Sequence, residues 1–467
     1  MPLNEVDTIV FLMLENRSFD QMLGYLSLDE TEPGLPVDGL RTDPAWRFPF
    51  ANVSRGAEYP IRKISGGQQI RQDPPHGHES IAMQIGTPPR GPGADKMGGF
   101  VESYVRAHRR VDDPGVVMGY YDAADLPTYD FLARNFCVCD RWFTSVPLGT
   151  QANRLMAMAG ESRVLDNVTG LPDQQLVYDW LDEREVPWGV YVSGGYAPFF
   201  IMMGRLTFRI AKSLAFGNGD FRRFSAFRRD WQSDGAIPSV IFIEPEYADA
   251  PMSDPNDDHP PAAVSKGQDF VRDIYEIVTS NPARWARTLM IVTYDEHGGF
   301  FDHVPPPEVE TIIGGVALRT LGPRVPALLV SPHVAAGQVF SETLDHTSVL
   351  QLIAERFGGG AEYSDEVTRR TATMGRISAA LQPRVREGRP PRMLPQRPRV
   401  GPAAVPAAPT APNTPNAAAV DAIMRDLATQ HPELIEQPGW REMRAYLATN
   451  APPMPEHRDN SGDADEL

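Results

Sequence analysis

Two continuous apolar runs end in clusters of polar residues. Residues 6–14 lead directly into Glu15 and Asn16, and residues 288–294 lead into Asp295 and Glu296. Each run is too short to cross a membrane and predicts a strand buried on both faces of a sheet. In open sheets of mostly parallel strands, ligands bind beyond the carboxyl ends of the strands. One such pair alone would suggest a solvated loop, but its recurrence predicts a shared site built from oxygen ligands.

Shorter apolar runs and amphipathic segments complete an α/β pattern. Further buried strands are expected at residues 136–139, 186–192, 238–247 and 324–333. Residues 270–278 carry apolar side chains at helical spacing, and another helix is expected near residues 344–353 with Thr347 or Ser348 as its cap. Residues 27–98 are rich in proline and glycine and are expected to be mostly loop.

Residues 196–216 combine aromatic and methionine side chains with Arg and Lys. The spacing favours a helix whose apolar face is turned to the core. The alternative is an interfacial lip that dips into a lipid surface beside the site. The two readings differ in whether the apolar side chains are buried by protein.

Composition and charge limit the kinds of molecule that the chain is expected to bind. The chain of 467 residues is 42% hydrophobic and has a formal net charge of −17. A chain of this length can bury a large core, whereas its charge argues against a nucleic-acid partner and against charge-driven attachment to anionic membranes. Its two cysteines, Cys137 and Cys139, are too few and too close for a disulfide framework or a thiolate metal site. We expect them to pack in the core.

The chain is expected to divide into three segments. These are a catalytic domain at 1–383, a Pro/Ala/Arg-rich linker at 384–417, and a short helical C-terminal extension with an acidic tail at 418–467. The N-terminus lacks the basic and apolar regions of a signal peptide, and no apolar run is long enough to span a bilayer. We therefore expect a soluble protein without a transmembrane segment, either cytoplasmic or exported by a leaderless route.

Two loops carry further candidate chemistry. Residues 73–79 contain His76 and His78, which are able to ligate a metal or to act as acid and base, although such a loop is more often a solvated turn. Thr150 follows a Pro-Leu-Gly turn and precedes a helix-forming run, where free N–H groups favour an anion. A threonine there is either a simple helix cap or a nucleophile.

Four motifs in order resemble one enzyme family. They are residues 15–20 (Glu-Asn-Arg-Ser-Phe-Asp), 145–154 (Ser-Val-Pro-Leu-Gly-Thr-Gln-Ala-Asn-Arg), 256–260 (Asn-Asp-Asp-His-Pro) and 293–303 (Thr-Tyr-Asp-Glu-His-Gly-Gly-Phe-Phe-Asp-His). Together they resemble the phosphoesterase family of bacterial and plant non-specific phospholipases C and related acid phosphatases, in the alkaline-phosphatase-like superfamily. The resemblance covers about residues 5 to 380 and implies a three-layer α/β/α sandwich around a mostly parallel sheet, with a small C-terminal helical extension.

The resemblance also implies roles for matching residues. The implied ligands of one divalent metal ion are Glu15, Asn16, Thr150, Asp295 and Glu296. Thr150 is also the implied nucleophile, where related acid phosphatases have Ser and phospholipase-type members have Thr. His76 and the pair Asp258–His259 would surround the phosphoryl oxygens and the leaving group. Because the spacing in this loop is loose, His78 is an alternative to His76.

Three more histidines lie within or after the last of these motifs. His297 and His303 are expected to orient Asp295 or Glu296. His346, in a His-Thr-Ser segment similar to one in the family, lies either near the site or at the start of a helix with a structural role.

This ligand set favours Ca²⁺, Mg²⁺ or Mn²⁺, although the family kinship leaves Zn²⁺ open. Metal binding would lower the pKa of the Thr150 hydroxyl for attack on phosphorus, giving a phosphothreonine that water hydrolyses. We expect a phospholipase C that cleaves glycerophospholipids of the phosphatidylcholine type to diacylglycerol and a phosphorylated head group, with transient contact with a membrane surface. The alternatives are an acid phosphatase on small monoesters and, less favoured, a non-catalytic phosphate- or lipid-binding protein.

Overall fold

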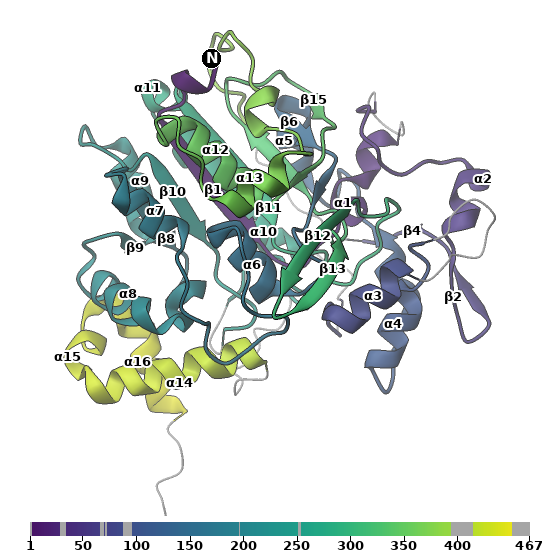
Figure 1. Ribbon diagram of the computed structural model, residues 1–467, viewed down its shortest axis with the longest axis horizontal. Coiled ribbons are helices and arrows are strands. Elements are labelled where there is room, and N and C mark those ends of the chain that lie inside the picture. The colour runs from purple at the N-terminus through teal and green to yellow at the C-terminus, as the bar shows by residue number, and fades with distance from the viewer. Residues whose placement is uncertain are drawn as a thin grey trace, which may run out of the picture.

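The computed structural model describes residues 2–28, 34–65, 70, 72–86, 96–195, 197–250, 254–393 and 414–450. An eight-stranded sheet runs through its centre (Figure 1). In spatial order, its strands are β15 (Gln338–Phe340), β6 (Cys137–Cys139), β14 (Ala327–Val330), β11 (Thr288–Tyr294), β1 (Thr8–Leu14), β10 (Val240–Glu244), β8 (Trp188–Val192) and β9 (Phe221–Arg223). Only β14 runs antiparallel to its neighbours in this sheet, so the predicted mostly parallel sheet is confirmed.

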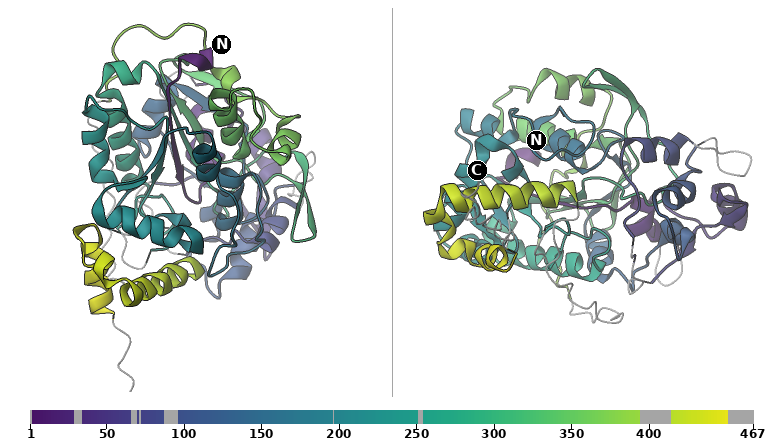
Figure 2. Two further views of the ribbon diagram at one scale, coloured as in Figure 1. Left: turned by 60° about the vertical axis from the view of Figure 1, so that its left-hand side comes forward. Right: turned by 90° about the horizontal axis from the view of Figure 1, so that it is seen from below.

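Helices cover both faces of the sheet. The helices of the first half of the chain are α1 (Phe19–Met22), α2 (Pro44–Arg47), α3 (His78–Gly86), α4 (Phe100–Ala107), α5 (Pro127–Asn135), α6 (Thr150–Ala159), α7 (Val177–Glu183), α8 (Gly204–Phe216) and α9 (Phe227–Gln232). Those of the second half are α10 (Val264–Thr279), α11 (Pro282–Trp285), α12 (Thr347–Phe357), α13 (Asp365–Thr371), α14 (Pro415–Gln430), α15 (Pro432–Ile435) and α16 (Arg441–Thr449). In the left view of Figure 2 the strands stand between a teal group and a green group of helices. The predicted α/β/α sandwich is therefore observed.

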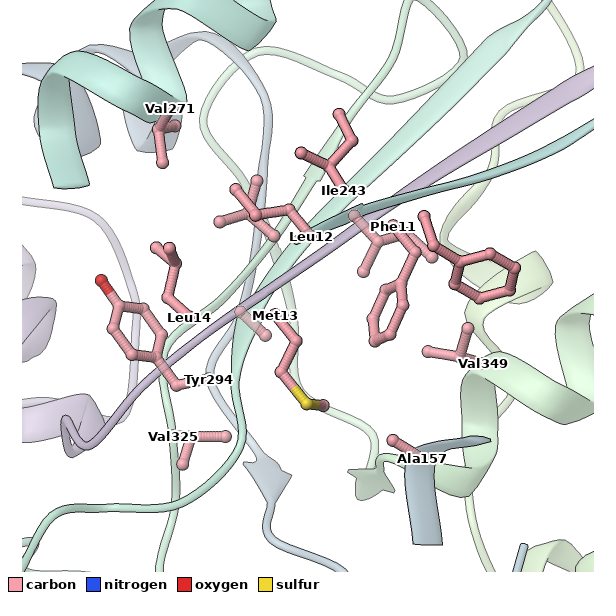
Figure 3. Packing of buried hydrophobic residues seen from close by; sticks show 14 of the residues in the cluster. Phe11, Leu12, Met13, Leu14, Ala157, Ile243, Val271, Tyr294, Val325 and Val349 are labelled. Atoms are coloured by element: carbon pink, nitrogen blue, oxygen red, sulfur yellow. The ribbon is translucent and has the colours of Figure 1, made fainter. Parts of the chain in front are cut away.

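The alternation of side chains along β1 explains why both faces are apolar. Successive residues of a strand point to opposite faces of a sheet. Figure 3 shows Leu12 and Leu14 directed toward Val271 of α10, and Phe11 and Met13 directed to the other face. All seven residues of β1 are buried, as are all seven of β11. A continuous apolar run is the pattern that such a two-sided environment requires.

Smaller sheets flank this core. Their strands are β2 (Asn52–Ser54), β3 (Ala57–Tyr59), β4 (Arg62–Lys63), β5 (Gly119–Tyr120), β7 (Trp142–Phe143), β12 (Glu308–Ile313), β13 (Val316–Thr320) and β16 (Leu344–Asp345). The region 27–98, expected to be mostly loop, thus contains β2, β3, β4, α2 and α3. These elements were missed because most of them are too short to show a periodic pattern.

Two further expectations concern helices. Within 197–216, α8 buries Leu206, Ile210 and Leu214, so the core-facing reading is confirmed; residue 196 lies outside the described residues. At the start of α12 the cap is His346 instead of the expected Thr or Ser. None of the described helices is apolar over the length needed to cross a bilayer.

The C-terminal extension packs at the end of the molecule opposite to the N-terminus, as the yellow helices in Figures 1 and 2 show. Its first helix, α14, begins at Pro415, inside the segment expected to be linker. Most of that linker (394–413) and the acidic tail (451–467) lie outside the described residues. Cys137 and Cys139 are buried and unpaired, as expected.

Candidate active site

The carboxyl ends of β1 and β11 bring the two predicted polar clusters together. These strands pair in parallel with Leu14 opposite Tyr294, so Glu15 and Asp295 leave the sheet next to each other. The backbone N–H of Asn16 donates to Oδ1 of Asp295 at 3.3 Å. The register of two adjacent strands therefore joins segments that are about 280 residues apart in sequence.

Two glycines turn the chain back over this end of the sheet. Gly298 and Gly299 have φ values of +63° and +71°, which residues with a Cβ rarely adopt. A Cβ on Gly298 would lie 2.2 Å from the carbonyl oxygen of Asn16, and one on Gly299 would lie 2.8 Å from Cβ of Pro74. These close approaches hold the loop that carries His76 against the end of β11.

The four side chains at these strand ends each keep one buried oxygen without a hydrogen-bond partner among the described residues. These atoms are Glu15 Oε2, Asn16 Oδ1, Asp295 Oδ2 and Glu296 Oε1. Each unsatisfied buried polar atom costs roughly 1–3 kcal/mol, so four in one place call for an explanation. A cation that takes up the missing contacts provides one. Carboxylate and amide oxygens suit a hard divalent cation, and the residues present therefore fit the implied metal.

Backbone groups hold the other oxygens of two of these carboxylates. Oδ1 of Asp295 accepts from the N–H of Glu296 at 2.7 Å as well as from Asn16. Oε2 of Glu296 accepts from the N–H of Gly298 at 2.8 Å. Each carboxylate is thus fixed at one oxygen and leaves the second for a ligand.

Arg154 places a buried guanidinium between two candidate ligands. Its Nη2 lies 3.0 Å from Oε1 of Glu15, and its Nε lies 3.3 Å from Oδ2 of Asp295. The guanidinium carbon lies 5.1 and 4.9 Å from the ring centroids of Phe199 and Tyr247, and Nη1 donates to the Tyr247 hydroxyl at 3.0 Å. This clamp fixes a positive charge that compensates part of the carboxylate charge.

Thr150 is the first residue of α6, after the N-cap Gly149, and is 2% exposed. The candidate nucleophile is therefore at a helix N-terminus, where backbone dipoles favour an anion. A Cβ on Gly149 would lie 3.3 Å from the carbonyl oxygen of His76. The turn that presents Thr150 thus lies directly against the histidine loop.

His76 and His259 share the carboxylate of Asp73. Oδ2 of Asp73 lies 3.8 Å from Nδ1 of His76 and 3.9 Å from Nε2 of His259. The two rings meet edge to face with their centroids 6.0 Å apart. His76 also lies 3.5 Å from the Asn16 amide nitrogen and 3.7 Å from Oε1 of Glu296. Of the two alternatives in this loop, His76 is the one that contacts candidate ligands.

The same three residues form a second donor set. Asp73, His76 and His259 each offer a ligand atom within 4.8 Å of the others. However, the Nδ1 atoms of the two histidines lie 2.8 and 2.5 Å from the carbonyl oxygens of Pro74 and Pro260. Nδ1–H donation to these carbonyls leaves Nε2 of each ring as the atom available for other chemistry.

Burial and charge shift the pKa values of the carboxyl groups in different directions. Burial raises the pKa of Glu15 well above its ordinary value and that of Asp295 to about 6, although Arg154 opposes both shifts. Burial also acts to raise the pKa of Glu296, but His76, His297 and the N–H of Gly298 together outweigh it and the net shift is downward. A cluster of buried carboxylates that Arg154 compensates only in part is what a bound cation would stabilise.

The pKa values of His76 and His259 are both raised. Burial acts to lower the pKa of His76, but Glu296 and Asp73 raise it above its ordinary value. Burial likewise acts against the charge of His259, but Asp73 and Asp249 raise its pKa to about 10. Both rings therefore favour the protonated form that attracts a phosphate.

Asp258 lies beside these groups in sequence, but its carboxylate is held by aromatic hydroxyls. Its Oδ2 accepts from Tyr294 at 2.6 Å and from Tyr129 at 2.9 Å. The preceding residue, Asp257, accepts the N–H of Glu15 at its carbonyl oxygen at 2.8 Å. Asp258 is thus placed to support the loop, and its role in catalysis stays a prediction.

The chain matches the model of the Phosphoesterase family over residues 6–359. It belongs to this family. The phosphoesterase is 32% identical over 361 residues to non-specific phospholipase C4 of Arabidopsis thaliana; the match covers 72% of this chain and 63%, less than two thirds, of that relative. It is 29% identical over 419 residues to phospholipase C B of Mycobacterium tuberculosis, with 76% of this chain and 74% of that relative covered.

Among solved structures, a phosphonate monoester hydrolase of Agrobacterium radiobacter matches with a TM-score of 0.33 at 13% identity, over 50% of this chain and 69% of that one. At that score the likeness adds nothing to what the strand order already shows. Family membership and the names of the relatives support a phosphoric ester hydrolase.

Two other histidines of the phosphoesterase contact candidate ligands. Nδ1 of His297 lies 3.3 Å from Oε2 of Glu296. Nε2 of His346 donates to the backbone oxygen of Asp295 at 2.7 Å, and its Nδ1 accepts from Trp142 at 3.2 Å. Burial lowers the pKa of His346 to about 4, so one neutral tautomer satisfies both bonds. Both histidines are placed to orient the end of β11.

His303 lies in a different cluster. Its Nδ1 is 2.8 Å from Oδ2 of Asp20, and its Nε2 is 3.3 Å from Oδ1 of Asp38. The fully buried Arg324 bonds to Asp20 at 3.1 Å and to Asp302 at 2.9 Å, where a metal would otherwise fit. Among the described residues, His303 has no contact with Asp295 or Glu296. Its position therefore does not match the expected role of orienting these carboxylates.

The sequence reading assigned no role to Arg154 or Asp73. Arg154 lies four residues after Thr150, one helical turn along, and that spacing placed it on the same face of α6. No periodic pattern predicts the place of Asp73, because it lies in a loop. His78 begins α3, and its Nδ1 has no hydrogen-bond partner among the described residues.

Proposed function

We propose that this phosphoesterase is a metal-dependent phospholipase C. It hydrolyses the glycerol-side phosphate ester of a glycerophospholipid and releases diacylglycerol and a phosphorylated head group. The observation that carries this proposal is the set of four buried oxygens without a hydrogen bond at strand ends that Arg154, on the helix of Thr150, contacts. The names of the Arabidopsis and Mycobacterium relatives support a phospholipid substrate.

The side chains around Thr150 suit the binding of a phosphodiester. His76 and His259 supply positive charge and ring N–H groups, and the N-terminus of α6 supplies a favourable dipole. Arg154 holds Glu15 and keeps its second oxygen directed away from solvent. Local charge therefore attracts the substrate despite the negative net charge of the chain.

The Thr150 oxygen attacks phosphorus in line with the diacylglycerol oxygen. The Thr150 hydroxyl releases its proton to solvent as the new O–P bond forms. The bond to the diacylglycerol oxygen breaks, and Nε2 of His259 gives that oxygen a proton, leaving a phosphothreonine that still carries the head group. Water then attacks the same phosphorus and gives a proton back to His259, the phosphorylated head group leaves, and the Thr150 oxygen regains a proton from solvent. A bound divalent cation would supply charge that lowers the pKa of the Thr150 hydroxyl and neutralises the phosphoryl oxygens.

The test compares hydrolysis of phosphatidylcholine and of p-nitrophenyl phosphate by the wild type and Thr150→Ala, with and without a chelator. We expect diacylglycerol from the wild type, loss of at least about a thousandfold in the variant, and loss with chelator that Ca²⁺, Mg²⁺ or Mn²⁺ restores. Thr150→Ser, which keeps a hydroxyl, should retain measurable turnover.

Other outcomes identify the alternatives. Cleavage of the monoester alone would make the protein a phosphatase. Metal binding without turnover of either substrate would make it a binding protein. Full activity of Thr150→Ala on either substrate would refute the proposed nucleophile.

A further inference from the structure

The β12–β13 hairpin ends in an exposed tip without charged side chains. Residues 311–318 read Thr-Ile-Ile-Gly-Gly-Val-Ala-Leu. At this tip Ile312 is 67% exposed and Val316 is 39% exposed. The hairpin is visible in front of α6 in Figure 1 and stands at the edge of the molecule in the left view of Figure 2. Single exposed apolar residues are common, but several on one protruding turn are a feature to explain.

The outer face of the hairpin changes from charged to apolar along its length. Glu308, Glu310 and Ile312 alternate on the exposed side of β12, and Ala317 and Arg319 do so on β13. On this face the apolar pair Ile312–Ala317 lies toward the turn and the charges lie toward the base, while Val316 pairs with Ile313 at the turn itself. An element of this kind can place its tip in an apolar phase while its charges stay in water.

The inner face attaches this tip to the helix of Thr150. Ile313 and Leu318 pack in one buried cluster with Val146, Leu148, Ala152 and Met156, on both sides of Thr150. The turn at Gly314 also approaches Leu165, which belongs to the next loop. The tip is therefore a rigid neighbour of the candidate nucleophile.

That next loop adds a third exposed apolar residue, close in sequence to the start of α6. Val168 is 37% exposed, and its N–H and carbonyl are both hydrogen-bonded to the side chain of Gln151, at 2.8 Å each. Asn167 accepts the backbone N–H of Gln151 at 3.3 Å. Two separate loops thus carry exposed apolar side chains on elements fixed to the start of α6.

We propose that Ile312, Val316 and Val168 form a docking surface that inserts into a zwitterionic phospholipid surface and brings the Thr150 site to its substrate. This rests on the proposed phospholipase activity. Charge decides between occupants: a chain with a net charge of −17 repels both an anionic bilayer and a second copy of itself, whereas a phosphocholine surface has no net charge. The turn at 311–318 fits that surface because it carries no charge and its insertion buries apolar side chains. Glu161, Glu310, Glu366 and Arg369 lie around the groove that Ile312 lines, so insertion is limited to the turn and leaves these charges in water.

The test measures sedimentation of the full-length protein with phosphatidylcholine vesicles, for the wild type and the double variant Ile312→Ser/Val316→Ser. We expect the wild type to bind and the double variant to bind at least about tenfold more weakly. Phe48→Ser removes a residue of similar exposure (55%) in the separate region of α2 and should leave binding unchanged. Equal vesicle binding by the wild type and the double variant, or no binding by the wild type, would overturn the proposal.

Turnover of a vesicle substrate and of a soluble substrate distinguishes a failure of the docking surface from a failure of the proposed activity. The double variant should lose turnover of vesicle phosphatidylcholine but retain that of a soluble short-chain phosphatidylcholine below its micellar concentration. Equal loss on both substrates would contradict a docking role. If neither substrate is hydrolysed by the wild type, the proposed function fails, and vesicle binding alone decides the docking surface. If the wild type forms a dimer that the double variant does not, the tip is a contact between copies and the lipid proposal is wrong.

Discussion

At the scale of single residues, Arg154 has the most informative surroundings. It pairs with both Glu15 and Asp295 while two aromatic rings hold its guanidinium. A buried charge pair that loses one partner leaves an uncompensated charge, which typically costs about 3–5 kcal/mol. Glu15 and Asp295 are also candidate metal ligands, so a cation is able to compensate the same charge.

We therefore expect Arg154→Met to lower the free energy of unfolding by about 3–5 kcal/mol in the presence of chelator, and by less when Mn²⁺ or Ca²⁺ is added. Denaturant unfolding under both conditions measures the difference. The control is Arg370→Met, since Arg370 is equally buried but bonds to Asp345 at 2.8 Å, away from the candidate ligands. Recovery of both variants by metal, or of neither, would contradict this account.

His303 gives a pH-dependent prediction. Burial acts to lower its pKa, but Asp20 and Asp38 raise it to about 9, above the value of about 6.5 in the unfolded chain. The folded state therefore holds this proton more tightly, and the stability it contributes is lost as pH rises from about 6.5 through 9. His303→Gln should remove a pH-dependent component of roughly 1–3 kcal/mol from the free energy of unfolding across this window.

Denaturant unfolding at pH 6 and pH 9.5 measures that component. His431→Gln, on the C-terminal extension, is the control and should leave the wild-type pH dependence in place. A His303→Gln protein with the same loss of stability between the two pH values as the wild type would refute the assignment.

At the scale of elements, the site depends on how tightly the glycine turn after β11 packs on the residues after β1. Gly298 has positive φ, and any Cβ there would meet the carbonyl oxygen of Asn16 at 2.2 Å. Gly56, in the turn between β2 and β3, has φ of +81° but no atom within 4 Å of a built Cβ. A side chain at either position would be strained by the positive φ, but only at Gly298 would its Cβ also meet a neighbouring atom.

Gly298→Ala should therefore lower the free energy of unfolding by roughly 1–3 kcal/mol more than Gly56→Ala, because only the first substitution also forces strand ends apart. Denaturant unfolding of both variants measures this difference. Metal affinity, measured by calorimetry, should fall only in Gly298→Ala. Equal destabilisation by the two substitutions would show that the contact with Asn16 relaxes without cost.

At the scale of the whole molecule, the C-terminal extension is joined both to the catalytic core and to the neighbourhood of the site. The buried Trp440 donates from Nε1 to the carbonyl oxygen of Ala211 in α8 at 3.0 Å. Asn416, at the start of α14, accepts from Gln151 at 2.7 Å and donates to Asp249 at 3.1 Å. The extension thus contacts the residue that follows Thr150.

Trp440→Ala should lower stability by about 3–5 kcal/mol and speed amide hydrogen exchange in α14–α16 more than in β1 and β11. Phe208→Ala, which removes a half-exposed ring from α8, should cost less than about 1 kcal/mol. Uniform acceleration of exchange throughout the chain in Trp440→Ala would mean that the extension and the core unfold as one unit.

The sequence predicted the central strands and the polar residues at their ends because these features are local. A run of apolar residues such as 6–14 specifies a two-sided buried strand wherever it lies, and the residue after it must lie at the edge of the sheet. The four candidate ligands Glu15, Asn16, Asp295 and Glu296 could therefore be named from pattern and resemblance. The short elements between 27 and 98 could not, because they are too brief to be periodic.

Only the tertiary structure decided which partners these residues have. Asp73 meets His76 and His259 through loop geometry, and His303 pairs with Asp20 instead of the end of β11. The exposure of Ile312 likewise depends on which side of its hairpin the core occupies. Local sequence determines which segments are apolar strands and which of these end in charge. Contacts across hundreds of residues depend on strand order, register and packing, which no local pattern contains.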